Sequence, residues 1–547
     1  MSNYKPFHPL IPLFCLLIFW QPLCACTNLL VTKGASADGS VMITYTCDGE
    51  FHPTLRYLQA ADHLPGDSLV ISDWDGKVRG RIAQVPHTYA VVHLMNEYQL
   101  CISETTFDGR LELENPQGVL HYWDMMRLAL QRAKTAREAI QVMTDLVEEY
   151  GYRSTGESFS IADPEEAWIM EMIGPGPGGK GAAWVALRVP DGTISCHANK
   201  ARIGEFPLND PRNCLYSKNV ISLATEKGYY DPTSGKPFSF RDTYCPATPR
   251  NQRYADARVW SIMRRAAPTL QLSPDYHRAA EGAEPYPLWI KPDKKLDLKD
   301  VMALMRDHFE GTDYDMTKGI DAGPYDSPNR WRPITWMVDS VEYVWERPIS
   351  TQQTGYSFIS QARSWLPREV GGVLWYGVDD TYTTCYFPLY CCVTEVPKSF
   401  RTGGLDQFSW DSAWWVFNFA ANFANLRYRD MIVDILTVRD DLEGMMLALQ
   451  PAVERTAADL LKSNPELAKC YLTEYSVMRG EMVVDRWRKL GEDLIRKYND
   501  GYVQREKGDP QEVGYPEEWL REVVRSRPYQ FLLKKKPPDI PESRLID

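Results

Sequence analysis

The chain has 547 residues, a formal net charge of −12 and 44% hydrophobic residues, values that are ordinary for a globular protein. Its length allows about two to four domains, or one large domain with elaborations. The acidic balance argues against nucleic acid or an anionic membrane surface as a partner. After the first 25 residues no stretch is long and apolar enough to span a membrane, so no membrane span is predicted.

The chain begins with a segment typical of a signal peptide, predicted over residues 1–25. The uncharged run IPLFCLLIFW, from Ile11 to Trp20, is too short for a bilayer span and suits the hydrophobic part of a secretory signal. Ala25 is the small residue that signal peptidase requires. Such a signal would direct export to the periplasm or the extracellular space. Cleavage after Ala25 would then leave Cys26 as the first residue of the mature chain.

An N-terminal cysteine carries a nucleophile and a base on one residue. The α-amine has an ordinary pKa of about 7.7–8.0 and the thiol one of about 8.5, so the amine can accept the thiol proton. The alternative is lipid attachment at Cys26, which would acylate the amine and leave a surface lipoprotein that binds peptides or glycans. The two interpretations exclude each other.

The segment after Cys26 favours the enzyme. An apolar strand at Thr27–Thr32, a turn rich in Gly, Ser and Asp, and a second strand at Val41–Tyr45 predict a β-hairpin. Mature lipoproteins usually begin with a flexible polar tether. A strand at the very start of the chain is expected when the terminus itself must be held in a site.

Strands and helices alternate over the next part of the chain. Strands are expected at Tyr89–Leu94 and Gln99–Glu104, and the i, i+3, i+4 apolar spacing predicts helices at Tyr122–Arg132 and Ala136–Tyr150. Four further segments predict one antiparallel meander: residues 156–163, 165–174, 182–192 and 193–203. This order suggests a layered sandwich of two sheets and helices.

The second half is more varied. Helices are expected at Arg253–Ala266 and Asp297–His308, strands at Thr335–Trp345 and Gly371–Trp375, and a long loop at Gly311–Pro333 that is either functional or structural. Four helices are then predicted, with Pro451 ending the second of them: Trp410–Arg427, Met431–Gln450, Ala452–Leu461 and Tyr471–Tyr498. These helices either pack on the core as a cap or form a subunit interface, and a homo-oligomer is one option.

The chain contains twelve cysteines, scattered without metal-ligand spacing. No metal or other cofactor is therefore predicted. Disulfide pairing of the exported protein stays open, and most of the cysteines are expected to be small buried apolar residues.

Several motifs in order resemble the dipeptidase A type of cysteine peptidases, which belong to the N-terminal nucleophile hydrolases and are related to bile salt hydrolase and penicillin V acylase. The resemblance covers Cys26 to about Asp430 and rests on these motifs: CTNLLVTKGASADGS, MNEYQLCISETTFDGR, GESFSIADPEEAWIMEMIG, HANKARI, YYDPTSGKPFSF and GPYDSPNRWRP. It implies an α+β fold with a four-layer αββα sandwich. The expected organisation is a hydrolase domain over residues 26–405, with loop-rich insertions at about 204–335, and a mainly helical C-terminal region over residues 406–547.

The resemblance also implies catalytic roles. Cys26 would be the nucleophile with its own amine as the base, and Asp48 would hold and orient that amine. Asn199 would contribute its side-chain amide to the oxyanion hole, where such a donor stabilises the intermediate by about 3 kcal/mol. Thr106 occupies the position of a backbone donor to the same hole, and Arg258 matches an arginine close to the nucleophile in the acylase relatives.

One position departs from the family pattern. Many relatives carry an arginine just before the aspartate, where this chain has Tyr45, which can donate a hydrogen bond but carries no positive charge. Carboxylates are expected to bind the free amine of a dipeptide, and the candidates are Glu104, Glu157 and the loop residues Asp313, Asp321 and Asp326. Tyr45 is a further candidate for substrate binding.

The sequence therefore predicts an exported dipeptidase that hydrolyses small peptides through a Cys26 thioester. An N-acyl amide hydrolase is the alternative enzyme, and the lipid-anchored binding protein is the alternative without catalysis.

Overall fold

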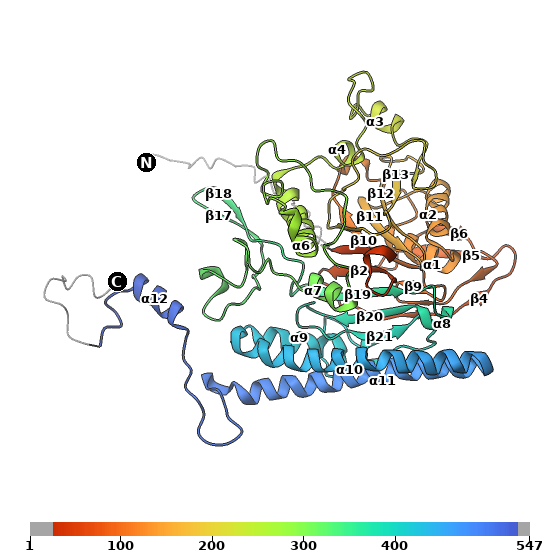
Figure 1. The fold of residues 1–547 in the computed structure, drawn as a ribbon. Coiled ribbons are helices and arrows are strands. Elements are labelled where there is room, and N and C mark those ends of the chain that lie inside the picture. The colour runs from red at the N-terminus through yellow and green to blue at the C-terminus, as the bar shows by residue number, and fades with distance from the viewer. Residues whose placement is uncertain (1–25, 534–547) are drawn as a thin grey trace, which may run out of the picture.

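The computed structural model describes residues 26–533, and the predicted signal peptide and the last 14 residues, 534–547, lie outside this range. Helices and several β-sheets form the described part, which confirms the α+β class. Two large sheets form the centre of the molecule (Figure 1).

The first sheet has seven strands in the order β16-β14-β1-β2-β19-β20-β21. Its strands β1 and β2 form the predicted antiparallel hairpin, with Leu30 opposite Ile43. The predicted segment at residues 371–375 corresponds to β20, whereas β19, which pairs with β2, was not predicted. The bounds are β1 Asn28–Val31, β2 Val41–Asp48, β14 Ile194–His197, β16 Trp289–Ile290, β19 Thr354–Ala362, β20 Val373–Val378 and β21 Phe387–Tyr390.

The second sheet has eight strands in the order β15-β13-β12-β11-β10-β9-β8-β3. Every residue of β11 and β12 is buried, because both faces of these central strands are covered. The bounds are β3 Tyr57–Leu58, β8 Val91–Val92, β9 Met95–Asn96, β10 Cys101–Phe107, β11 Gly156–Ala162, β12 Ala167–Ile173, β13 Ala183–Arg188 and β15 Cys214–Tyr216.

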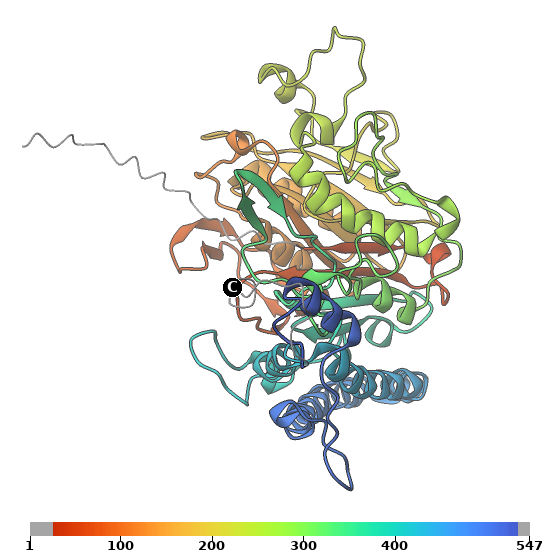
Figure 2. The ribbon, with the colours of Figure 1, turned by 90° about the vertical axis from the view of Figure 1, so that its left-hand side faces the viewer.

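The two sheets face one another, with β1 and β2 of the first against β10 and β11 of the second. Helices α1 (Tyr122–Arg132) and α2 (Ala136–Tyr150), predicted with these bounds, pack on β10 and β11. Helices α6 (Ala257–Ala266) and α7 (Leu298–Met305) pack on β14 and β19 of the first sheet. Figure 2 shows the same succession of elements from the side.

The prediction of one four-stranded meander is wrong for its last segment. Strands β11, β12 and β13 are neighbours in the second sheet, but β14 crosses to the first sheet and pairs with β1, placing Asn28 opposite His197. The turn at Asp191–Gly192 has the same chemistry in either topology, so the local sequence does not distinguish a hairpin from a change of sheet. This crossing brings the segment after β14 next to the start of β1.

Three helices of the C-terminal region lie at the β20–β21 end of the first sheet (Figure 1). They are α9 (Ala413–Ala424), α10 (Tyr428–Ser463) and α11 (Pro465–Lys497). The prediction that Pro451 separates two helices is wrong, because α10 continues through it. A proline inside a helix removes one backbone hydrogen bond, and here that loss does not end the helix. Of the two options for this region, the structure shows packing on the core, with α9 on β20 and α11 on β21.

Shorter elements complete the described chain. The predicted strand at residues 335–345 is a two-stranded hairpin, and residues 311–333 contain only one short 3₁₀ turn, Ile320–Ala322. Within residues 26–533 no helix has the length and apolar character needed to cross a bilayer. The remaining strands and α-helices are β4 Ala61–Asp62, β5 Ser68–Ser72, β6 Val78–Ala83, β7 His87–Thr88, β17 Thr335–Val338, β18 Val341–Val344, α3 Ser222–Glu226, α4 Phe240–Tyr244, α5 Pro249–Asn251, α8 Arg368–Gly371 and α12 Glu517–Ser526.

Candidate active site around Cys26

Cys26 lies directly before β1, between the two sheets, and is completely buried. Thr27 and Thr46 exchange backbone hydrogen bonds of 3.4 and 3.1 Å, so the chain is already part of the first sheet one residue after Cys26. The backbone N–H of Thr27 also donates to the Thr46 hydroxyl at 3.0 Å. These contacts fix the position of Cys26 relative to β2.

The nitrogen of Cys26 donates a hydrogen bond of 3.0 Å to the side-chain oxygen of Asn199. Asn199 follows the end of β14 and has a φ of 58°, a left-handed conformation that asparagine tolerates better than most residues. Its side-chain nitrogen donates to the Thr106 carbonyl at 2.7 Å. The Asn199 side chain therefore connects the start of β1 with β10 of the opposite sheet.

Arg258 completes this arrangement from the first turn of α6. One guanidinium nitrogen donates to the Cys26 carbonyl at 2.7 Å and to the Thr27 hydroxyl at 2.9 Å, and the other donates to the Asn199 oxygen at 2.8 Å. Burial, followed by the nearby charge of Arg347, lowers the pKa of Arg258 to about 10. The guanidinium is still protonated at neutral pH and binds both residues at once.

The thiol of Cys26 faces Tyr45 on β2 and Glu104 on β10. Its sulfur lies 3.8 Å from the Tyr45 hydroxyl and 3.9 Å from Glu104 Oε1, and the Tyr45 hydroxyl donates a short hydrogen bond to that same oxygen. Burial raises the pKa of the Cys26 thiol, and the neighbouring Cys47 and Glu104 add to this effect. The thiol is therefore the resting form.

Glu104 and Glu157 form a buried pair of carboxyl groups beside this thiol. Glu157 accepts a hydrogen bond of 2.9 Å from the Thr106 hydroxyl, and one oxygen of each carboxyl group has no donor among the described residues. Burial, and then the charge of Glu104, raises the pKa of Glu157 well above its ordinary value. Burial also raises the pKa of Glu104, so ionisation of both carboxyl groups at once is disfavoured.

Asp48 lies at the end of β2, and Arg347 donates to its carboxylate at 2.6 Å and Thr354 at 2.7 Å. The charge of Asp48 contributes to the raised pKa of Cys26, which places it near the site. Burial raises the pKa of Asp48, and Arg347 opposes this effect. The Cys26 nitrogen donates to Asn199, and the expected role of Asp48 at the amine stays a prediction.

Two residues in this neighbourhood, Arg347 and Cys47, were not predicted from sequence motifs. Arg347 is distant in sequence and reaches Asp48 only through the pairing of β2 with β19. Asp326 has a different environment from the other candidates, because its carboxylate pairs with Arg429 of α10 at 2.6 Å. No contact between described residues links Asp326 to the group around Cys26.

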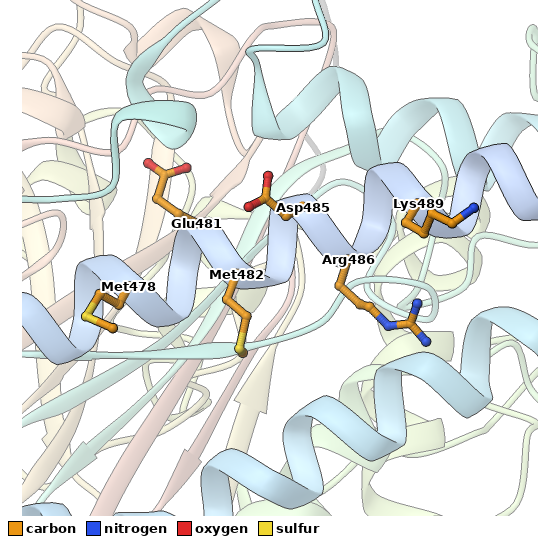
Figure 3. Close-up of a pocket in the computed structure, with 6 residues that line it drawn as sticks. All are labelled: Met478, Glu481, Met482, Asp485, Arg486 and Lys489. Carbon is orange, nitrogen blue, oxygen red and sulfur yellow. The ribbon is translucent and has the colours of Figure 1, made fainter.

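Two surface hollows within residues 26–533 share no lining residue with the contacts around Cys26. A shallow one on α11 is lined only by side chains of that helix (Figure 3): Met478, Glu481, Met482, Asp485, Arg486 and Lys489. The other lies beside β13, and its lining includes Arg188, Arg202 and Trp289. No group of three or more His, Cys, Asp or Glu side chains in the described chain is arranged to hold a metal ion. The side chains around Cys26 are therefore the best candidate for an active site among the described residues.

Comparison with known proteins agrees with this location. The model of peptidase family C69 matches residues 25–440, a range that begins directly before Cys26 and covers most of the chain. The chain belongs to peptidase family C69. The resemblance to the dipeptidase A type is thereby confirmed, and this C69 chain is a cysteine-type peptidase.

Curated relatives of this C69 chain are named as probable dipeptidases. A probable dipeptidase of Salmonella dublin is 26% identical over 394 residues, which cover 67% of this chain and 81% of the relative. One from Latilactobacillus sakei is 25% identical, covering 74% and 82%. The probable dipeptidase B of Streptococcus pyogenes serotype M1 is 23% identical, covering 86% and 93%.

Proposed function

We propose that this peptidase is an exported dipeptidase in which Cys26, freed by removal of residues 1–25, is an N-terminal nucleophile. The observation that carries the proposal is the convergence of Asn199 and Arg258 on Cys26 in a family C69 chain. The contact of two sheets with helices on their outer faces supports assignment to the αββα sandwich of N-terminal nucleophile hydrolases. The names of the curated relatives support a dipeptide substrate.

In the proposed reaction the α-amine of Cys26 accepts the thiol proton, and the sulfur attacks the scissile carbonyl carbon. Asn199 orients the amine through its side-chain oxygen, and its amide together with a backbone N–H near Thr106 stabilises the oxyanion. The α-ammonium then protonates the leaving amine, which departs and leaves a thioester. Water hydrolyses the thioester with the α-amine as the base.

The free amine of the substrate has a suitable partner in Glu104. In a dipeptide the α-ammonium nitrogen lies only about 2.5 Å from the scissile carbonyl carbon, because one Cα atom separates them. A carboxylate that binds this ammonium must therefore lie beside the nucleophile, and Glu104 Oε1 lies 3.9 Å from the Cys26 sulfur. Binding of the ammonium would offset the unfavourable burial of the Glu104 charge. An N-acylated substrate has no charge to offer there.

The intact mass and N-terminal sequence of the exported protein test the first step. A free Cys26 at the terminus supports the proposal, whereas a chain that starts elsewhere, or a diacylglyceryl adduct at Cys26, contradicts it. Cys26→Ser should lose most turnover of a dipeptide panel. The exposed Cys470→Ser is the matched control and should keep it.

Substrate class is tested by comparing dipeptides with acyl-glycine substrates on the same preparation. Faster turnover of dipeptides supports the proposal. A preference for acyl-glycine would instead assign the chain to the N-acyl amide hydrolases. Fractionation of the native host, with peptidase activity in the exported fraction, tests the proposed location.

A further inference from the structure

The residue opposite Cys26 in the first sheet is a second cysteine, Cys47. The pairs Thr27–Thr46 and Leu30–Ile43 define one antiparallel register between the start of the chain and β2. Extending this register by one residue places Cys26 directly across from Cys47. Because Thr27 and Thr46 exchange both backbone hydrogen bonds, the next pair is of the non-hydrogen-bonded type.

This position suits a covalent link between the two side chains. The Cα atoms of a non-hydrogen-bonded antiparallel pair are about 4.5 Å apart, within the range of about 4.4–6.8 Å that disulfides span. The Cys47 thiol lies close enough to Cys26 and Tyr356 to raise the pKa of both groups further above what burial alone produces. Both cysteines are free thiols in the structure.

The two thiols differ in their access to solvent. Cys26 is completely buried, whereas Cys47 is partly exposed. A small oxidant therefore reaches Cys47 first, and Cys26 is the thiol held next to it. The other buried cysteines of the described chain lack this pairing of an accessible thiol with the residue at the centre of the site.

We propose that Cys26 and Cys47 form a reversible oxidative modification site, which closes to a disulfide on exposure to a peroxide and removes Cys26 from catalysis. The loss of turnover rests on the proposed role of Cys26, whereas formation of the disulfide does not. An exported protein meets such oxidants without the reducing systems of the cytosol.

The steps balance with hydrogen peroxide as the oxidant. The Cys47 sulfur attacks one peroxide oxygen, the O–O bond breaks, and Cys47 becomes a sulfenic acid with release of one water. The Cys26 sulfur then attacks the Cys47 sulfur, the S–O bond breaks, and the hydroxyl leaves as a second water with the Cys26 proton. Peroxide is reduced, and two thiols become one disulfide. Because Cys47 is partly exposed, a small dithiol can reduce it again.

Peptide mapping of the full exported chain tests the link directly. Trypsin cleaves after Lys33, so the peptide that ends at Lys33 carries Cys26 and the peptide from Gly34 to Arg56 carries Cys47. After treatment with hydrogen peroxide and blocking of free thiols, we expect these two peptides to be joined, with a mass two hydrogens below their sum. Dithiothreitol should separate them and restore turnover at least 5-fold above the oxidised level, in proportion to the thiols recovered.

Two variants define the outcomes. Cys47→Ser should form no joined peptide, and its inactivation by peroxide should be slower than that of the parent. The exposed Cys470→Ser should behave as the parent does. Absence of the joined peptide in the parent, or reversible inactivation of Cys47→Ser at the parent's rate, would overturn the proposal. A joined peptide in a chain without peptidase activity would support the modification site and count only against the proposed function.

Discussion

Lys200 and Asp256 form a buried ion pair with a nitrogen-to-oxygen distance of 2.6 Å, and Tyr276 also accepts a hydrogen bond from the lysine at 2.8 Å. Lys200 directly follows Asn199, and Asp256 lies two residues before Arg258. The ion pair therefore joins the segment after β14 to the start of α6, and it supports the contact between Asn199 and Arg258 that holds Cys26.

Breaking this ion pair should disturb both stability and turnover. Removing one partner of a buried pair leaves an uncompensated charge and costs about 3–5 kcal/mol. We expect Asp256→Ala to lower the free energy of unfolding in urea by about 3 kcal/mol and to reduce kcat more than it changes KM. Lys462→Ala, which removes an exposed partner of Asp459, is the control and should change stability by less than about 0.5 kcal/mol. Equal effects of the two variants would contradict the role of this ion pair in supporting the contact between Asn199 and Arg258.

Arg258 should not be replaceable by lysine. Its guanidinium donates to the Cys26 carbonyl, the Thr27 hydroxyl and the Asn199 oxygen together, a geometry that a single ammonium group cannot reproduce. We expect Arg258→Lys to lower kcat/KM for a dipeptide by about 100-fold, as is found for a displaced catalytic geometry. Circular dichroism should show a folded protein, and Arg455→Lys on the exposed side of α10 should retain full activity. If Arg258→Lys turned over dipeptides as fast as the parent, the three guanidinium contacts would be dispensable.

Selectivity for a free amine should depend on Glu104. Glu104→Gln removes the charge but keeps an acceptor for the Tyr45 hydroxyl, so the preference for Ala-Ala over N-acetyl-Ala-Ala should fall by about 10-fold or more, equivalent to at least about 1.4 kcal/mol. The measurement is the ratio of kcat/KM for the two substrates. An unchanged ratio would remove Glu104 from substrate recognition.

The stability of the protein should fall as pH rises because of Asp379, which follows β20. Burial raises the pKa of Asp379 to about 8, and the charge of Asp380 acts in the same direction. The folded state thus binds the proton more tightly than the unfolded state, where the pKa is about 3.9, and the stabilisation is lost between these values. Asp379→Asn keeps the contact with Asn418 without titrating. Between pH 5 and pH 8 the parent should lose at least about 1 kcal/mol more than this variant in urea unfolding; parallel losses would refute the assignment.

Local sequence patterns predicted local structure well. The apolar spacing at Tyr122–Arg132 and Ala136–Tyr150 matches α1 and α2, since each helix has one buried face and a clear end. The hairpin after Cys26 is also confirmed. The central strand β19 was missed, because its buried sequence TGYSFISQA mixes polar and apolar residues without alternation.

In the predicted site, motifs identify residues, whereas contacts between distant parts of the chain are not predictable from the sequence. Motifs identified Asn199 and Arg258, which the structure places on Cys26. The contact of Asp48 with Arg347 was not predictable, because 299 positions separate them and only the pairing of β2 with β19 brings them together. The change of sheet at β14 is equally a long-range event, and it determines where Asn199 lies.

Helix α10 carries two buried glutamates that pair with arginines from the central part of the chain. Glu443 contacts Arg306 at 2.5 Å, and Glu454 contacts Arg363 at 2.6 Å. The family match ends at residue 440, inside this helix and before either glutamate. A chimera that exchanged only the C-terminal helices with those of a distant relative would therefore separate each arginine from its glutamate. The arginines and their glutamates have to be inherited together.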